Sequence, residues 1–106
     1  MSNTIEITKE DFGYYLEFAL QQTTGVILNL SGADLYFFLK KDSTLIINPT
    51  VPNMDIVSAG SGTCHYLVKD EDFEDSGIYV GEIRAVIFGK VLTFPNILIS
   101  VKNSIA

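Results

Sequence analysis

The sequence predicts an all-β domain, and three observations lead to this prediction. Apolar and polar residues alternate over most of the chain, which places every other side chain on one face of a strand. Turn-forming residues separate these segments at roughly 10 to 15 residue intervals, a spacing typical of a β-sandwich or small barrel. The single cysteine among the 106 residues excludes a disulfide within the chain. We therefore expect one domain, residues 1–106, of about seven antiparallel strands.

The first half of the chain contains three alternating segments. They cover residues 5–7, 14–20 and 35–39. Their inward faces are expected to consist of Ile5 and Ile7, then Tyr14, Leu16, Phe18 and Leu20, and then Leu35, Phe37 and Leu39. Leu30-Ser31-Gly32 is expected to turn the chain into the third segment, with Leu30 closing one end of the core.

A helix competes for the second of these segments. Thr8 lies three residues before Asp11, as in a capping box, and apolar residues at helical spacing follow. Gly13 would lie inside that helix at a cost of ~1 kcal/mol relative to alanine. The run from Tyr14 to Phe18 is rich in strand-forming residues, so the prediction is a strand.

The second half begins with an irregular stretch, residues 48–59, which is expected to form a loop or to cross between sheets. Three strands are predicted after it, at residues 63–68, 78–88 and 91–101. Their inward residues are Cys64, Tyr66 and Val68, then Gly81, Ile83, Ala85 and Ile87, and finally Ile97, Ile99 and Val101. Gly89-Lys90 is expected to form a tight hairpin turn, and Pro95 to mark a bulge or edge position.

The run from Asp75 to Gly81 has the form of the start of strand F in an immunoglobulin domain. Tyr79 stands two residues before the position usually held by the second cysteine, which is Gly81 here. A tyrosine at this place can bond back to the preceding turn and close a corner between two sheets, which gives Asp75, Gly77 and Tyr79 a structural role. A turn followed by an ordinary core tyrosine is the alternative.

A wider set of residues, in order from Ile5 to Val101, carries a family resemblance. It comprises Gly13 with Leu16 and Phe18, Leu30-Ser31-Gly32-Ala33 with Leu35 and Phe37, Gly62 with Tyr66 and Leu67, Asp72 with Gly77-Ile78-Tyr79, and Gly89-Lys90 with Thr93-Phe94-Pro95. This pattern resembles the immunoglobulin-like domain of phage baseplate upper proteins and of small siphophage tail-associated proteins. The resemblance implies a non-catalytic structural module of the virion, made in the bacterial host cytoplasm.

The same resemblance implies contacts with other tail or baseplate proteins or with copies of the chain itself. Baseplate upper proteins continue into long coiled or receptor-holding segments, whereas this sequence stops after 106 residues. A stand-alone accessory protein or a single excised domain is therefore expected.

Charge and composition argue against several other functions. Seven Lys and Arg residues against thirteen Asp and Glu residues give a net charge of -6, and the basic residues are scattered, unlike a nucleic-acid groove. No apolar run approaches the ~20 residues that span a bilayer, and the N-terminal sequence lacks the features of a secretory signal. A reducing cytoplasm agrees with the single cysteine.

Two candidates for chemistry have simpler structural interpretations. Cys64 and His65 are adjacent, so in a strand they point to opposite faces and cannot act as nucleophile and base. Cys64 is expected to fill the core, and Tyr66 and Tyr79 to be core residues with hydrogen-bonded hydroxyls. We predict neither an enzyme nor a cofactor.

The acidic run from Asp70 to Asp75 is the strongest electrostatic feature of the sequence. Asp70, Asp72 and Glu74 alternate as in a loop that wraps calcium, but the sixth position, where such a loop needs glycine, is Asp75. A solvated acidic loop is favoured, with calcium binding as the alternative.

Apolar residues also lie on the faces expected to meet water. Tyr36 and Phe38 stand opposite the inward residues of their strand, and Leu92 and Phe94 stand opposite Thr93 and Pro95. Either a loop covers them, or they form a protein interface. The interface hypothesis comprises Tyr36, Phe38, Val86, Phe88 and Phe94. A carbohydrate-binding or host-adhesion module is the alternative function, although the chain has no tryptophan.

Overall fold

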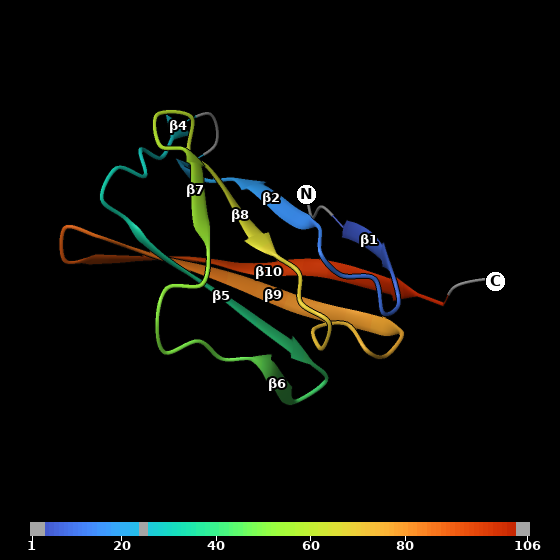
Figure 1. The fold of residues 1–106 in the computed structure, drawn as a ribbon. Coiled ribbons are helices and arrows are strands. Elements are labelled where there is room, and N and C mark those ends of the chain that lie inside the picture. The colour runs from blue at the N-terminus through green and yellow to red at the C-terminus, as the bar shows by residue number, and fades with distance from the viewer. Residues whose placement is uncertain (1–3, 24–25, 104–106) are drawn as a thin grey trace.

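The computed structural model describes residues 4–23 and 26–103, and all secondary structure within them is β (Figure 1). The strands are β1 (Thr4–Thr8), β2 (Tyr15–Ala19), β3 (Gln21–Thr23), β4 (Val26–Ile27), β5 (Asp34–Lys41), β6 (Thr44–Ile47), β7 (Asp55–Ser58), β8 (Thr63–Leu67), β9 (Gly77–Ile87) and β10 (Lys90–Lys102). One sheet has the order β1-β10-β9-β5-β6, a second has the order β2-β8-β7, and β3 pairs with β4. The predicted all-β fold is confirmed, and the two larger sheets agree with a β-sandwich.

The strand count and the expected pairing need correction. The two larger sheets contain eight strands, and the pair β3–β4 brings the described total to ten where about seven were expected. The strands without a clear alternation in the sequence are short: β3, β4, β6 and β7 have two to four residues each. The pairing is not antiparallel throughout, since β1 runs parallel to β10, with Ile5 beside Ile99. No hairpin joins these two strands, so no tight turn imposes an antiparallel direction.

The core lies between the two sheets and follows the predicted alternation. Leu35, Phe37 and Leu39 of β5 are buried, as are Ile83 and Ala85 of β9. From the facing sheet, the buried residues are Leu16 of β2, and Cys64 and Tyr66 of β8. Leu30 is fully buried, as expected of a residue that closes the end of the core.

The segment that could have been helical is strand β2, which confirms the choice made from residue preference. Leu16 is paired with Tyr66 of β8, and Gly13 before the strand has a φ of 86°. Residues 48–54 then connect β6 to β7 and so cross between the two larger sheets. This is one of the two forms expected for the irregular stretch.

At the centre of the core, the ring of Phe37 packs against Gly81 of β9, which has no side chain. A Cβ added to Gly81 would lie 3.1 Å from Cε1 of Phe37, so any side chain at Gly81 would have to displace this ring. Phe37 also lies near Tyr66, with 4.7 Å between the ring centroids. The ring of β5 thus occupies space that glycine leaves free and contacts the opposite sheet through β8.

A bulge in β10 changes which residues of this strand face the core. Leu92 pairs with Ala85 and Phe94 with Ile83, and the register shifts between Phe94 and Ile97. Pro95 therefore lies at a bulge, as predicted. The additional residue changes the alternation, so Leu92 and Phe94 pack against the core, and their expected position on the opposite face is wrong.

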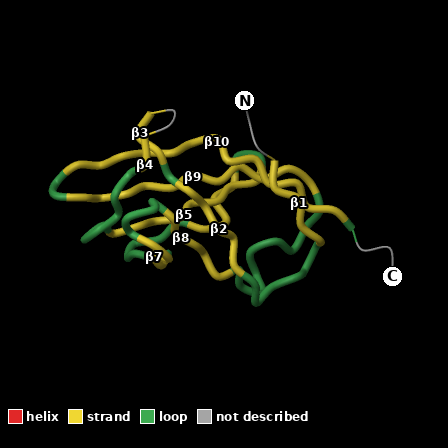
Figure 2. The backbone as a smooth tube through the Cα atoms, turned by 90° about the horizontal axis from the view of Figure 1, so that it is seen from above, coloured by secondary structure: helices red, strands yellow, loops and turns green. Residues whose placement is uncertain are grey.

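The turn between β9 and β10 lies one residue earlier than expected. Ile87 pairs with Lys90, so the loop consists of Phe88 and Gly89. These residues have φ values of 50° and 79°, and positive φ at both positions is the feature of a type I′ turn. In the rotated view, the two strands run side by side along the molecule and end in a projecting hairpin (Figure 2).

Candidate interaction surface

The face of the five-stranded sheet that points away from the core forms the candidate surface, hereafter the outer face. The strand register places its side chains in rows across β5, β9 and β10. Starting at the β9–β10 hairpin and moving toward the other end of the sheet, the rows are Asp34 with Val86 and Val91, Tyr36 with Arg84 and Thr93, Phe38 with Glu82, and Lys40 with Val80 and Leu98. Apolar side chains occur in every row, whereas a sheet face exposed to water is commonly polar.

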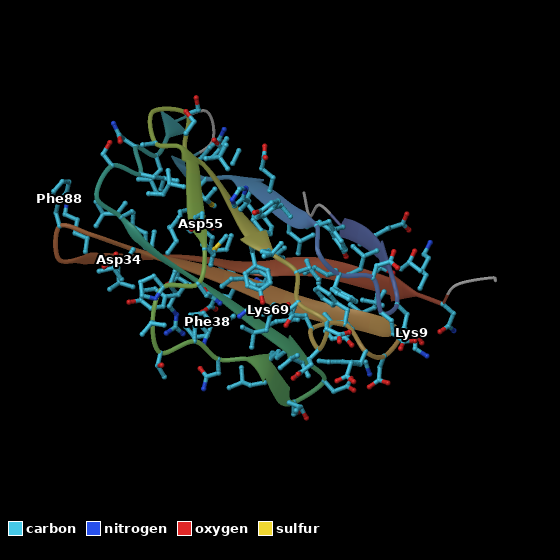
Figure 3. The ribbon with its side chains drawn as sticks, viewed as in Figure 1. Lys9, Asp34, Phe38, Asp55, Lys69 and Phe88 are labelled. Carbon is cyan, nitrogen blue, oxygen red and sulfur yellow. The ribbon has the colours of Figure 1, made fainter. Side chains whose placement is uncertain are left out.

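The centre of the outer face is organised around Arg84. Its guanidinium carbon lies 4.5 Å from the centroid of the Phe38 ring, which is a cation–π arrangement. Its Nε donates a hydrogen bond of 2.9 Å to Oε2 of Glu82. The side chain of Phe38, labelled in Figure 3, is half-buried, and the guanidinium of Arg84 covers part of its ring.

An open hollow of about 490 Å³ lies on the outer face. Phe38, Leu45, Val80 and Pro95 contribute apolar side chains to it, and Lys40, Glu82 and Arg84 contribute charged ones. Leu45 is 56% exposed. This combination of apolar and charged side chains is suited to a protein partner.

The connection between β6 and β7 is attached to the backbone of β5 through Asn53. Asn53 accepts a hydrogen bond of 2.7 Å from the backbone nitrogen of Phe37, and its side-chain nitrogen donates one of 3.1 Å to the Phe37 carbonyl. The amide of Asn53 thereby continues the hydrogen-bond pattern of β5 beyond β6. Tyr36 and Phe38 themselves are half-buried.

The five residues expected at an interface do not share one place. Tyr36, Phe38 and Val86 lie on the outer face, and Phe88 lies at the hairpin tip with 89% of its surface exposed. Phe94 packs toward the core and is half-buried, on the face opposite the outer face. Sequence reasoning missed Leu45, Val80, Val91 and Leu98; alternation along β9 could have indicated Val80.

The corner before β9 is closed by a tyrosine hydroxyl. Oη of Tyr79 donates a hydrogen bond of 2.9 Å to the Asp75 carbonyl, and the Asp75 backbone nitrogen lies 3.3 Å from the same oxygen. The Tyr79 ring is buried and makes an edge contact with Phe73, with ring centroids 5.2 Å apart. Gly77 between them has a φ of 133°. These residues fasten the loop to the core.

Asp72 is buried, so the expectation of a fully solvated acidic loop is wrong at this residue. Its Oδ2 accepts hydrogen bonds of 2.7 Å from the Tyr66 hydroxyl and of 2.8 Å from the Lys69 backbone nitrogen. Burial raises the pKa of Tyr66, and the bond to Asp72 raises it further. The carboxylate that would be the middle ligand of a calcium loop therefore points inward.

Cys64 and His65 lie on opposite sides of β8. The Cys64 side chain is fully buried, and burial raises the pKa of its thiol to about 11. The His65 ring stacks on Tyr15 with centroids 3.9 Å apart, and its Nε2 lies 3.8 Å from Oδ2 of Asp55. The two residues form no nucleophile and base pair with each other. Within residues 4–23 and 26–103, His, Cys, Asp and Glu side chains form no group of three or more suited to a metal ion.

Comparison with known proteins gives no relative for this chain. No family model matches the sequence, and no curated protein or solved structure is significantly similar to it. In the described part of the chain, no helix has the length and apolar character to cross a membrane. The fold and the outer face are therefore the basis for a functional proposal.

Proposed function

We propose that this chain is a non-catalytic immunoglobulin-like module of a phage tail or baseplate, which assembles with other proteins through the outer face. The observation that carries the proposal is the apolar character of this face in every row of the sheet. The virion setting rests on the sequence resemblance to baseplate upper-protein domains.

The strand order supports the immunoglobulin-like assignment. In such domains strands G, F and C form one sheet, joined by C′ in the variable type, while B, E and D belong to the other sheet. Strands β10, β9, β5 and β6 can be assigned to G, F, C and C′. In the other sheet, the order β2-β8-β7 then corresponds to B-E-D. With this assignment, the strand letters run alphabetically along the chain from β5 to β10, and β2 precedes them as B. Strand β1 then takes the place of strand A beside G.

The core supports the same assignment without a disulfide. Antibody domains pack a strand C tryptophan against a disulfide between strands B and F. Here Phe37 of β5 fills the space at Gly81 of β9, two residues after the corner tyrosine Tyr79. Under this assignment, Phe37 and Gly81 correspond to the tryptophan and the second cysteine of antibody domains.

Co-expression with the proteins encoded beside this gene tests the proposal. We expect a stable complex with at least one of them, and we expect Phe38→Glu to abolish it, because a carboxylate would be placed under Arg84 in the apolar surface. Leu67→Glu is the matched control: Leu67 is also exposed, at 42%, but belongs to the other sheet.

Two results would contradict the assembly role. One is a complex that tolerates Phe38→Glu as well as Leu67→Glu, provided that thermal melts show both variants folded. The other is the absence of any protein complex together with saturable binding on a glycan array, which would favour the carbohydrate-binding alternative.

A further inference from the structure

The hairpin between β9 and β10 presents an apolar projection. Phe88 at its tip is 89% exposed, and Val91 on the following strand is 61% exposed. The hairpin extends beyond the neighbouring strands at the end of the molecule where Figure 3 labels Phe88. Exposed apolar side chains at a projecting tip contribute nothing to the core of their own domain.

Phe88 also adopts an unfavourable backbone conformation. Its φ of 50° lies in the left-handed region, where a bulky side chain is unusual. The two central positions of a type I′ turn are most often Asn, Asp or Gly. A phenylalanine at position 88 is therefore not explained by the stability of this domain. A backbone outlier of this kind points to a role outside the fold.

The hollow on the outer face is large enough to receive such a side chain. Its volume is about 490 Å³, whereas an apolar cavity of about 150 Å³ suffices to bind benzene. Phe38, Leu45, Val80 and Pro95 would contact an inserted ring, and the guanidinium of Arg84 lies at its side. The hollow therefore has room for the Phe88 ring together with an aliphatic side chain such as Val91.

The tip cannot reach the hollow of its own chain. Glu82, a residue at the hollow, lies on β9, and Phe88 directly follows the end of this strand; the two are six positions apart, which is roughly 20 Å at about 3.3 Å per residue. Both belong to the same sheet, so a change of loop conformation would not bring them together. The Phe88 ring of one chain can enter only the hollow of another.

We propose that copies of this chain assemble head to tail, with the β9–β10 hairpin of one copy inserted in the outer-face hollow of the next. This inference rests on the proposed function, because it uses the same face, and it names a second copy as the partner. Such a contact is heterologous, so an open assembly keeps one free tip and one free hollow, and it either grows into a longer chain or closes into a ring.

Charge near the joint does not drive this contact. Lys90 follows the turn at the tip, whereas the hollow carries Lys40 and Arg84 against Glu82, which is already paired with Arg84. The net charge of -6 on every copy opposes association over longer distances. Association is therefore expected to strengthen when salt is raised from about 10 mM to about 150 mM, because the Debye length falls from about 30 Å to about 8 Å.

Sedimentation velocity of the purified chain over a concentration series is the first test. The mass should rise from 11.7 kDa through dimers to larger species as concentration increases. Phe88→Asn should weaken association at least tenfold while raising Tm by about 4 to 8 °C, because asparagine tolerates the turn conformation. Val57→Asn is the control, since Val57 is 48% exposed but lies on β7, and it should associate like the wild type.

Mixing two variants provides the decisive test. Phe88→Asn keeps an intact hollow, and Leu45→Glu keeps an intact hairpin while placing a charge in the hollow. Each variant alone should remain monomeric, whereas an equimolar mixture should form heterodimers of twice the monomer mass and nothing larger. Recovery of association by mixing requires a tip from one variant and a hollow from the other.

Three results would overturn the head-to-tail contact. They are a wild type that stays monomeric at millimolar concentration, a Phe88→Asn variant that associates like the wild type, and a mixture of the two variants that remains monomeric. A monomeric wild type that still forms a complex with a neighbouring gene product, lost in Phe38→Glu, would overturn the self-assembly inference and leave the proposed function standing.

Discussion

The two ends of strand β9 differ in how an aromatic residue is placed: one is buried and the other is exposed. Near the loop end, Tyr79 is 2% exposed and its hydroxyl is bonded to the backbone of Asp75. At the hairpin end, Phe88 is 89% exposed in a backbone conformation that suits smaller residues. Tyr79 stabilises the fold at the loop end, whereas Phe88 at the hairpin end has a backbone conformation that lowers stability and a side chain that remains exposed. One strand therefore connects a region that holds the fold to a region available for contact.

The largest effect is expected at the loop end, from Asp72→Ala. This change removes the acceptor for the buried Tyr66 hydroxyl and for the Lys69 backbone nitrogen. Leaving such donors unpaired should lower the free energy of unfolding by about 3 kcal/mol in urea denaturation. Glu71→Ala is the control in the same loop, because Glu71 is exposed, and it should change stability by less than about 0.5 kcal/mol. Equal effects of the two changes would show that the buried hydrogen bonds of Asp72 do not stabilise the loop end.

Alkaline pH should produce the next largest effect. The pKa of the Cys64 thiol is about 11 in the folded chain, against about 8.5 for an unperturbed thiol. Between these values the unfolded chain has lost the proton that the folded chain retains, so stability falls as pH rises, by about 2 to 3 kcal/mol at pH 11. The raised pKa of Tyr66 acts with the same sign above about pH 10.

Urea denaturation between pH 8 and pH 11 measures this loss. Cys64→Val should remove the part that begins near pH 8.5, and Tyr66→Phe the part at higher pH. The hairpin variant Phe88→Asn contains both groups and should keep the full dependence. A Cys64→Val protein with an unchanged pH profile would show that another group is responsible.

A pair of glycine substitutions compares the two ends at a smaller scale. Gly77→Ala places a side chain at a φ of 133°, with its Cβ 3.0 Å from Cε of Lys41. Gly89→Ala has a φ of 79° and no heavy atom within 4 Å of the added Cβ. We expect losses of about 2 kcal/mol and about 1 kcal/mol, respectively, by urea denaturation. A larger loss at Gly89 would mean that the hairpin contributes more to stability than the loop end.

The alternation of apolar residues was sufficient to predict much of the fold. It placed Phe37, Tyr66 and Ile83 in the core, because strands buried on one face repeat with a period of two. The same rule failed in β10, where the bulge after Phe94 reverses the alternation. It also gave no signal for β6, where Leu45 and Ile46 are consecutive and both exposed. Pro95 indicated a bulge, but its effect on which residues face the core, and the pairing of a short edge strand, depend on neighbouring strands that a local pattern does not contain.

The candidate surface was predicted less completely, for two physical reasons. Tyr36 and Phe38 followed from alternation, but the hollow depends on Leu45 and Pro95, which come together only through sheet pairing. Phe88 was expected in a strand because phenylalanine is not a usual turn residue, and the structure places it in the turn itself. Asp72 was assigned to a solvated loop because its neighbours are acidic, whereas its burial depends on Tyr66.

The parallel pairing of β1 with β10 has a consequence for the order of folding. The register joins Thr4 to Leu98 and Thr8 to Lys102, which are separated by almost the whole described chain. Synthesis must therefore reach Lys102 before β1 finds its full complement of backbone partners. Pairings this distant in sequence are slow to form, because a long loop must close first. Until then, the edge of the nascent sheet remains open to other chains, and folding competes with aggregation.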